Sequence, residues 1–182
     1  MNMMNQIPYL DLITAPAEEP VSLAEAKVAL KIDNSEDDAF IGNLIKAARV
    51  MAEEFLKRKL ITQTWQLQYD NYAPSIVVLP KGPIQEIVHV KVIARDWSEE
   101  VIASENYYLN AGNENLHFEA ALLGQIVQIQ YITGYGAAAD VPEPIRQGII
   151  AHVINMYDNR MENKGMPPAS QSLYEKFRVV KL

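Results

Sequence analysis

The chain of 182 residues is 49% hydrophobic and 21% charged, a balance that favours a folded globular protein over a fibrous or disordered one. Its 16 basic and 23 acidic residues give a formal net charge of −7, which argues against broad binding to nucleic-acid phosphates. It has no cysteine, which excludes disulfides, thiolate metal sites and cysteine nucleophiles and fits a reducing cytosol. No apolar run approaches the ~18 residues that a membrane span needs, so neither insertion nor secretion is expected.

The first 21 residues predict an extended N-terminal arm, because Pro8, Pro16 and Pro20 punctuate them. Ser22 and Glu25 then have the spacing of a capping box, in which each side chain satisfies a free backbone N–H at the start of a helix. A short helix through about Lys31 is therefore expected.

A long helix is predicted over about residues 35–59, beginning at Ser35 with three carboxylates that favour the positive end of the helix dipole. Its apolar residues recur at spacings of three and four and form one stripe: Phe40, Ile41, Leu44, Ile45, Ala48, Ala52, Phe55 and Leu56. Arg49 and Glu53 fall mostly off this stripe, and Glu53-Glu54 is interpreted as part of a solvated face.

The hydrophobic period changes to two after Thr62, which is typical of strands with one apolar face. Strands are expected within 65–69, 76–79, 87–93, 107–109 and 127–131, separated by turns rich in Pro, Gly, Asn and Asp. Together they predict a small antiparallel β module over 62–136 that ends at Gly134-Tyr135-Gly136.

A third major helix is predicted over about 142–160, since proline is tolerated in the first turn of a helix. The tail over 165–182 is expected to hold at most one short helix, around 173–177. The predicted fold is thus α+β: a mainly helical core from 22–61 and 137–164, an inserted small β module, and extended terminal arms.

Nothing in the sequence predicts a catalytic, metal-binding or cofactor-binding site. His89, His117 and His152 lie far apart and have no short metal-ligand spacing, and the serines lack a G-x-S-x-G context. The cluster Gly134-Tyr135-Gly136 lacks the third glycine of a dinucleotide fingerprint. A hydrolase that uses acidic residues and His152 is the least favoured alternative.

One basic run, Lys57-Arg58-Lys59, is a candidate for contact with DNA. Its simpler interpretation is a positive charge at the carbonyl end of the long helix. Strand aromatics could stack bases, but without surrounding Lys and Arg they are expected to fill the core instead: Trp65, Tyr69, Tyr107, Tyr108 and Tyr131. A nucleic-acid-binding packaging factor therefore stays open as an alternative function.

Seven short motifs over about 140 residues share an order with a known protein family. They are Pro20 to Lys27 with Leu30 and Asp33; Asp37-Asp38; Arg58 with Ile61 to Trp65; Leu79 to Pro83; Tyr131 with Gly134 to Gly136; Val141 to Arg146; and Tyr157 to Arg160. In this order they resemble the head-tail connector (adaptor) proteins of tailed bacteriophages, their prophages and the related gene transfer agents.

The resemblance implies a structural protein of the virion, not an enzyme, and no cofactor. It implies a ring, twelve-fold in the virion, which docks under the portal protein and leads to a tail completion or stopper protein. DNA would pass through its channel without specific contacts, and assembly would occur in the cytoplasm of the host bacterium. The motif residues implied to serve folding and assembly are Leu79, Pro80, Pro83, Gly134, Tyr135, Gly136, Pro142, Tyr157 and Arg160.

Overall fold

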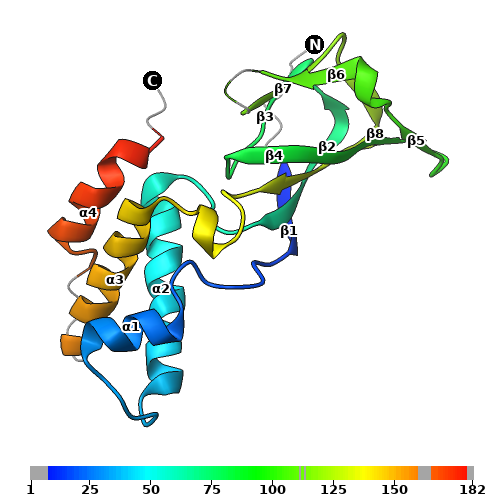
Figure 1. The fold of residues 1–182 in the computed structure, drawn as a ribbon. Helices are drawn as coiled ribbons and strands as arrows, with labels where there is room; N and C mark the ends of the chain where they lie inside the picture. The colour runs from blue at the N-terminus through cyan, green and yellow to red at the C-terminus, as the bar shows by residue number, and fades with distance from the viewer. Residues whose placement is uncertain (1–7, 111, 113, 160–164, 180–182) are drawn as a thin grey trace. The chain divides into compact units, whose positions relative to one another are not determined.

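The computed structural model describes residues 8–110, 112, 114–159 and 165–179, and the chain folds into two compact units. A β unit combines the N-terminal segment through Ala15 with Thr62–Gly134, and a helical unit combines Pro16–Ile61 with the segment from Tyr135 onward (Figure 1). Each unit therefore contains segments that are far apart in the sequence.

The helical unit begins with α1 (Leu23–Leu30), and the predicted capping box is present. The Ser22 hydroxyl accepts a bond from the Glu25 N–H at 3.2 Å, and the Glu25 carboxylate accepts one from the Ser22 N–H at 2.9 Å. These bonds hold the pKa of Glu25 below its usual value, and Arg146 adds to the effect. The helix ends at Lys31, which has the left-handed backbone conformation common at helix C-termini.

The long helix α2 (Asp38–Leu56) starts three residues later than predicted. Ser35 does not cap it with its side chain; instead its carbonyl accepts a turn bond from the Asp38 N–H at 3.3 Å. Lys57 takes the left-handed conformation and ends the helix, so the basic run follows α2 and does not form its last turn. The predicted stripe is confirmed along the helix, where Ile41, Ile45, Ala48, Ala52 and Leu56 are buried.

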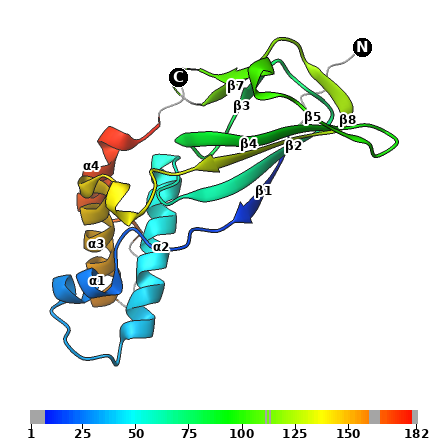
Figure 2. The same ribbon diagram turned by 45° about the vertical axis from the view of Figure 1, so that its right-hand side comes forward.

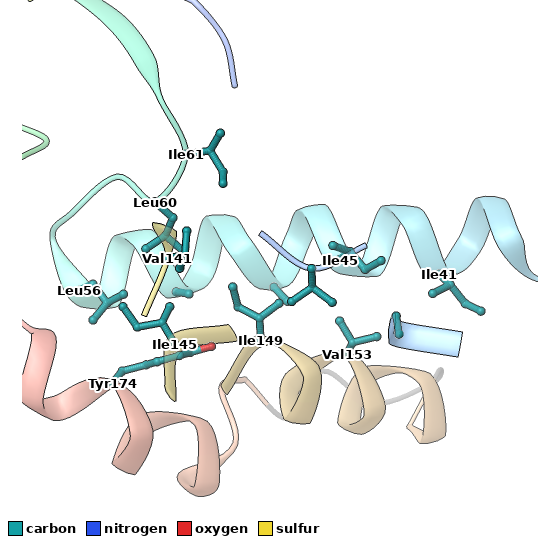
Figure 3. Packing of buried hydrophobic residues seen from close by; sticks show 14 residues of the cluster. Ile41, Ile45, Leu56, Leu60, Ile61, Val141, Ile145, Ile149, Val153 and Tyr174 are labelled. Atoms are coloured by element: carbon teal, nitrogen blue, oxygen red, sulfur yellow. The ribbon is translucent and has the colours of Figure 1, made fainter. Parts of the chain in front are cut away.

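The core of the helical unit lies between α2 and α3 (Glu143–Asp158). Ile145, Ile149 and Val153 of α3 face the α2 stripe (Figure 3). Helix α1 contacts both α2 and α3.

Helix α4 (Pro168–Tyr174) packs on α3 at Gly148, and a short 3-10 turn (Glu175–Phe177) follows it. The Gly148 carbonyl accepts a bond from the buried Ser170 hydroxyl at 2.8 Å, and the fully buried ring of Tyr174 lies against the glycine. Burial raises the pKa of Tyr174. Only a residue without a side chain lets the two helices come this close.

The β unit contains an antiparallel five-stranded sheet with strand order β1-β2-β8-β4-β5. Its strands are β1 (Tyr9–Thr14), β2 (Gln63–Ala73), β4 (Ile84–Ile93), β5 (Glu99–Val101) and β8 (Leu122–Thr133). Leu67, Val127, Ile129 and Tyr131 of the central strands are buried, whereas the intervening glutamines are half-buried. The alternation that predicted β2 and β8 thus reflects one covered and one polar face.

A second, three-stranded sheet has the order β3-β7-β6, built from β3 (Ile76–Val78), β6 (Tyr107–Leu109) and β7 (Asn115–Phe118). Val77 and Leu116 point into the core that it shares with the larger sheet. The opposite face of this sheet exposes Ile76, Val78 and Tyr108.

The expectation of a mainly helical protein with a small β insert is wrong. The structure is 36% helical and 33% strand, with one sheet of five strands and another of three. The predicted strands covered only the middles of β2 and β8 and the last seven residues of β4, and these strands extend over 10 to 12 residues. Strand β1 lies in the segment predicted as an arm, and it has no alternating pattern because nearly all of its residues are exposed.

No helix in the described ranges is both long and apolar enough to cross a bilayer.

Candidate functional site

The turn between β3 and β4 carries three of the family-motif residues. Leu79 is buried, and the carbonyl of Pro80 accepts a bond from the Tyr131 hydroxyl at 3.1 Å. The carbonyl of Pro83 accepts the Gly134 N–H at 3.0 Å. The turn therefore has one hydrogen bond to Tyr131 of strand β8 and one to Gly134, the residue that follows this strand.

Tyr135 and Gly136 lie where the chain enters the helical unit. The Tyr135 N–H donates to the Leu60 carbonyl at 2.9 Å, and Gly136 forms an isolated parallel bridge with Ile61. Gly136 has φ 138°, and a Cβ there would lie 2.3 Å from Oδ2 of Asp140. This position requires glycine for both its backbone conformation and its close contact.

Two motif residues belong to α3. Pro142 is the residue that caps its N-terminus. The Tyr157 hydroxyl donates a hydrogen bond to the Asp37 carboxylate, and its ring lies 6.1 Å from that of Phe40, which ties the end of α3 to the start of α2. Arg160 lies outside the described residues, so its predicted role is not placed.

The basic run has three different environments. Lys57 is exposed and Arg58 is half-buried. The Lys59 ammonium donates at 2.6 Å to the buried carboxylate of Glu53, which also accepts the Leu60 N–H at 3.1 Å. Lys59 is thus engaged in an internal ion pair.

Glu53 is the centre of a buried charged network that the sequence interpretation missed. Its side chain is 1% exposed and binds both Lys59 and, at 3.2 Å, Arg49 one helical turn earlier. Arg49 Nε in turn donates to Glu19 at 2.6 Å. Burial opposes the charge of Arg49, but Glu19 and Glu53 outweigh it and raise its pKa. The i,i+4 spacing of Arg49 and Glu53 was the available signal, and the partners from outside the helix offset the cost of burying the pair.

The three histidines do not come together. His152 is buried in the helical unit at 1% exposure, and that burial lowers its pKa although a bond to the Gly165 backbone opposes the shift. His117 stacks on Tyr108 at 4.9 Å in the three-stranded sheet, and His89 is half-buried on β4. In the part of the chain that the structure describes, no three His, Cys, Asp or Glu side chains could hold a metal ion together.

The β unit exposes most of the large apolar side chains found at the surface of the described residues. They are Tyr9, Leu12, Ile13, Ile76, Val78, Val88, Trp97, Val101, Tyr108 and Leu123, against only Val28 and Val50 in the helical unit. Tyr108 was predicted in the core, and that prediction is wrong. The exposure of the other residues was not predicted, because neither the strands that carry most of them nor the turn that carries Trp97 has a pattern that indicates it. Concentrated exposed apolar residues mark interaction surfaces in proteins.

Known structures share this fold across nearly the whole chain. A chain from the neck of an empty GTA particle, computed with C6 symmetry, has a TM-score of 0.80 and 19% identity, covering 96% of this chain and 97% of that one. A chain from the neck of a native GTA particle, computed with C12 symmetry, has a TM-score of 0.80, 20% identity and the same coverage. A chain from the virion of a native gene transfer agent (GTA) particle has a TM-score of 0.78 and 20% identity, covering 95% and 96%. At these identities the likeness establishes the shared fold.

The sequence itself identifies the family. No curated protein matches the chain, but the family of the head completion protein (HCP) matches residues 20–166. This match confirms the resemblance to phage head-tail connectors that the seven motifs indicated. The chain belongs to the head completion protein family, whose members are structural phage proteins and not enzymes.

Proposed function

We propose that this protein is a head-tail connector that assembles as a ring at the neck of a phage or phage-like particle. The observation that carries the proposal is that a fold covering 96% of the chain recurs in chains from particle necks computed with C6 and C12 symmetry. The family match over residues 20–166 agrees with it. A closed cyclic ring needs no further component than copies of one chain.

The proposed ring is twelve-fold and lies between the portal protein and a tail completion or stopper protein. Family membership supports these partners, and the virion is the proposed location, with assembly in the host bacterial cytoplasm. The absence of cysteine means that subunits are held by non-covalent contacts alone.

DNA passes through the proposed channel without being held. The net charge of −7 supports this, because excess carboxylate weakens attraction to phosphate. The ion pair of Lys59 with Glu53 also supports it, since it leaves the basic run with less free charge than its sequence suggests. The competing packaging-factor function needs an affinity for DNA that falls steeply with salt. A mobility-shift assay that finds such binding would favour that alternative.

Electron microscopy of the purified protein, with and without the portal protein of the same particle, tests the proposal. We expect closed rings, either free or seated on the portal. A protein that stays monomeric under both conditions and never binds the portal would contradict it.

A further inference from the structure

We infer that neighbouring copies of this chain meet edge to edge through the five-stranded sheet, the β5 edge of one copy against the β1 edge of the next. The inference deepens the proposed function and rests on the ring proposed there. Its occupant is a second copy of this chain.

A cyclic ring of more than two subunits requires two different surfaces on each subunit, because every copy contacts one neighbour on each side. The order β1-β2-β8-β4-β5 provides two such surfaces, since β1 and β5 are the opposite edges of one sheet. Open edges invite pairing with another chain, so proteins that remain monomeric usually cover or charge them. Strand β1 has six residues, five of them exposed, and its only charged residue is Asp11. Strand β5 has three exposed residues, of which Glu99 and Glu100 are charged and Val101 is apolar; the charge of Glu99 is paired with Lys91 of β4, which donates to it at 2.9 Å.

Both edges expose apolar side chains on matching positions of the sheet. Tyr9 on β1 is 61% exposed and Val101 on β5 is 60% exposed. The strand registers connect them through one row across the sheet, Tyr9, Gln68, Gln128, Lys91 and Val101. Tyr9 and Val101 therefore end the same row, which is the one row that β1 and β5 share in these registers, and a neighbouring sheet that continued it would bring Val101 of one copy to Tyr9 of the next.

The turn between β4 and β5 extends the β5 edge of the sheet and exposes a tryptophan. In both ribbon views this hairpin reaches beyond the other strands of its sheet (Figure 1 and Figure 2). Trp97 is 69% exposed and has φ 66°, a conformation that is unusual for a large side chain. The Asp96 carboxylate accepts bonds from the Ser98 N–H at 3.1 Å and hydroxyl at 2.7 Å, and the Ala94 carbonyl accepts the Trp97 N–H at 3.0 Å. The turn is thus ordered before any contact forms, which lowers the entropic cost of burying the indole on a neighbour.

The absence of cysteine from the chain makes a direct test possible. The variant carries Tyr9→Cys and Val101→Cys, and rings are formed with the portal protein before oxidation or treatment with a short bis-maleimide. Two control variants keep one edge thiol each and place the other on the three-stranded sheet, as Tyr9→Cys with Val78→Cys and as Val78→Cys with Val101→Cys. All three positions are more than half exposed, so the variants should fold, and their thermal midpoints are compared with the parent.

We expect a ladder of covalent multimers only from the variant with thiols at both edges, and at most dimers from either control variant. In a Trp65→Phe background, Trp97 is the only remaining tryptophan, and its emission should move to shorter wavelength when rings form. Rings that assemble normally but show neither the ladder nor the emission shift would overturn the inference and leave the proposed function standing. A ladder from a control variant in place of the edge variant would also overturn it. If the parent protein forms no ring, either free or with the portal, and does not bind the portal, the proposed function itself has failed.

Discussion

The close approach of α4 to α3 makes a sharp prediction about Gly148→Ala. The added Cβ would lie 2.3, 2.8 and 3.0 Å from Cε1, Cζ and Cδ1 of Tyr174. The ring cannot move aside freely because it is fully buried and lies 6.1 Å from the ring of Phe55. Overpacking of this kind costs about 1–3 kcal/mol, and the better helix propensity of alanine returns about 0.5–1 kcal/mol. We expect a net loss of about 1–2 kcal/mol in the free energy of unfolding.

Gly42→Ala is the matched control, because Gly42 also lies inside a helix but a Cβ there meets nothing within 4 Å. It should stabilise the protein by about 0.5–1 kcal/mol. Urea denaturation followed by circular dichroism at the helical band measures both variants. The double variant Gly148→Ala with Tyr174→Leu should lose less free energy of unfolding than the sum of the two single losses, by about 1 kcal/mol or more. A Gly148→Ala protein as stable as the Gly42→Ala protein would refute the packing argument.

Three further predictions concern stability. Glu53→Gln should cost about 3 kcal/mol in urea denaturation because it leaves the buried Arg49 with the Glu19 carboxylate alone and removes the buried carboxylate that Lys59 binds. Lys91→Ala, which breaks a more exposed pair, should cost at most about 1 kcal/mol; equal effects would contradict the burial argument. Gly136→Ala should lower the thermal midpoint through its positive φ and its clash with Asp140, and an unchanged midpoint would argue against the close contact. Burial holds the pKa of His152 below its unfolded value, so the folded state binds fewer protons, and the stability that His152 contributes should be complete above about pH 6.5 and decline as the pH falls below that value. His152→Gln should flatten this decline in denaturation midpoints measured from pH 7.5 to 5. An unaltered slope would assign the decline to other groups.

Local signals predicted the helical elements well. The Ser22–Glu25 capping box and the α2 stripe depend on residues within a turn or two of each other, and both were confirmed. The predicted start of α2 was three residues too early. A serine followed by carboxylates is a strong signal for a helix N-terminus, even where a turn precedes the helix. The family was recognised from the order of motifs that individually carry little information.

Non-local partners explain what the sequence could not predict. Strand β1 pairs with β2 at least 50 residues away and is exposed on most of its length, so no hydrophobic period distinguished it from an arm. Glu53 was predicted on a solvated helix face. It is buried because Lys59 and the backbone of Leu60, which follow the helix, bind its carboxylate. The exposure of Tyr9 and Val101 was missed for the same reason, because it depends on which other strands of the fold cover them and not on a pattern within their own strands.

The most direct test of the connector function is a reconstruction of the neck in particles that carry this protein. We predict a closed ring of this fold at the junction of head and tail, positioned between the portal protein and the tail completion protein. Particles whose heads are joined to tails through a neck that lacks this fold would contradict it.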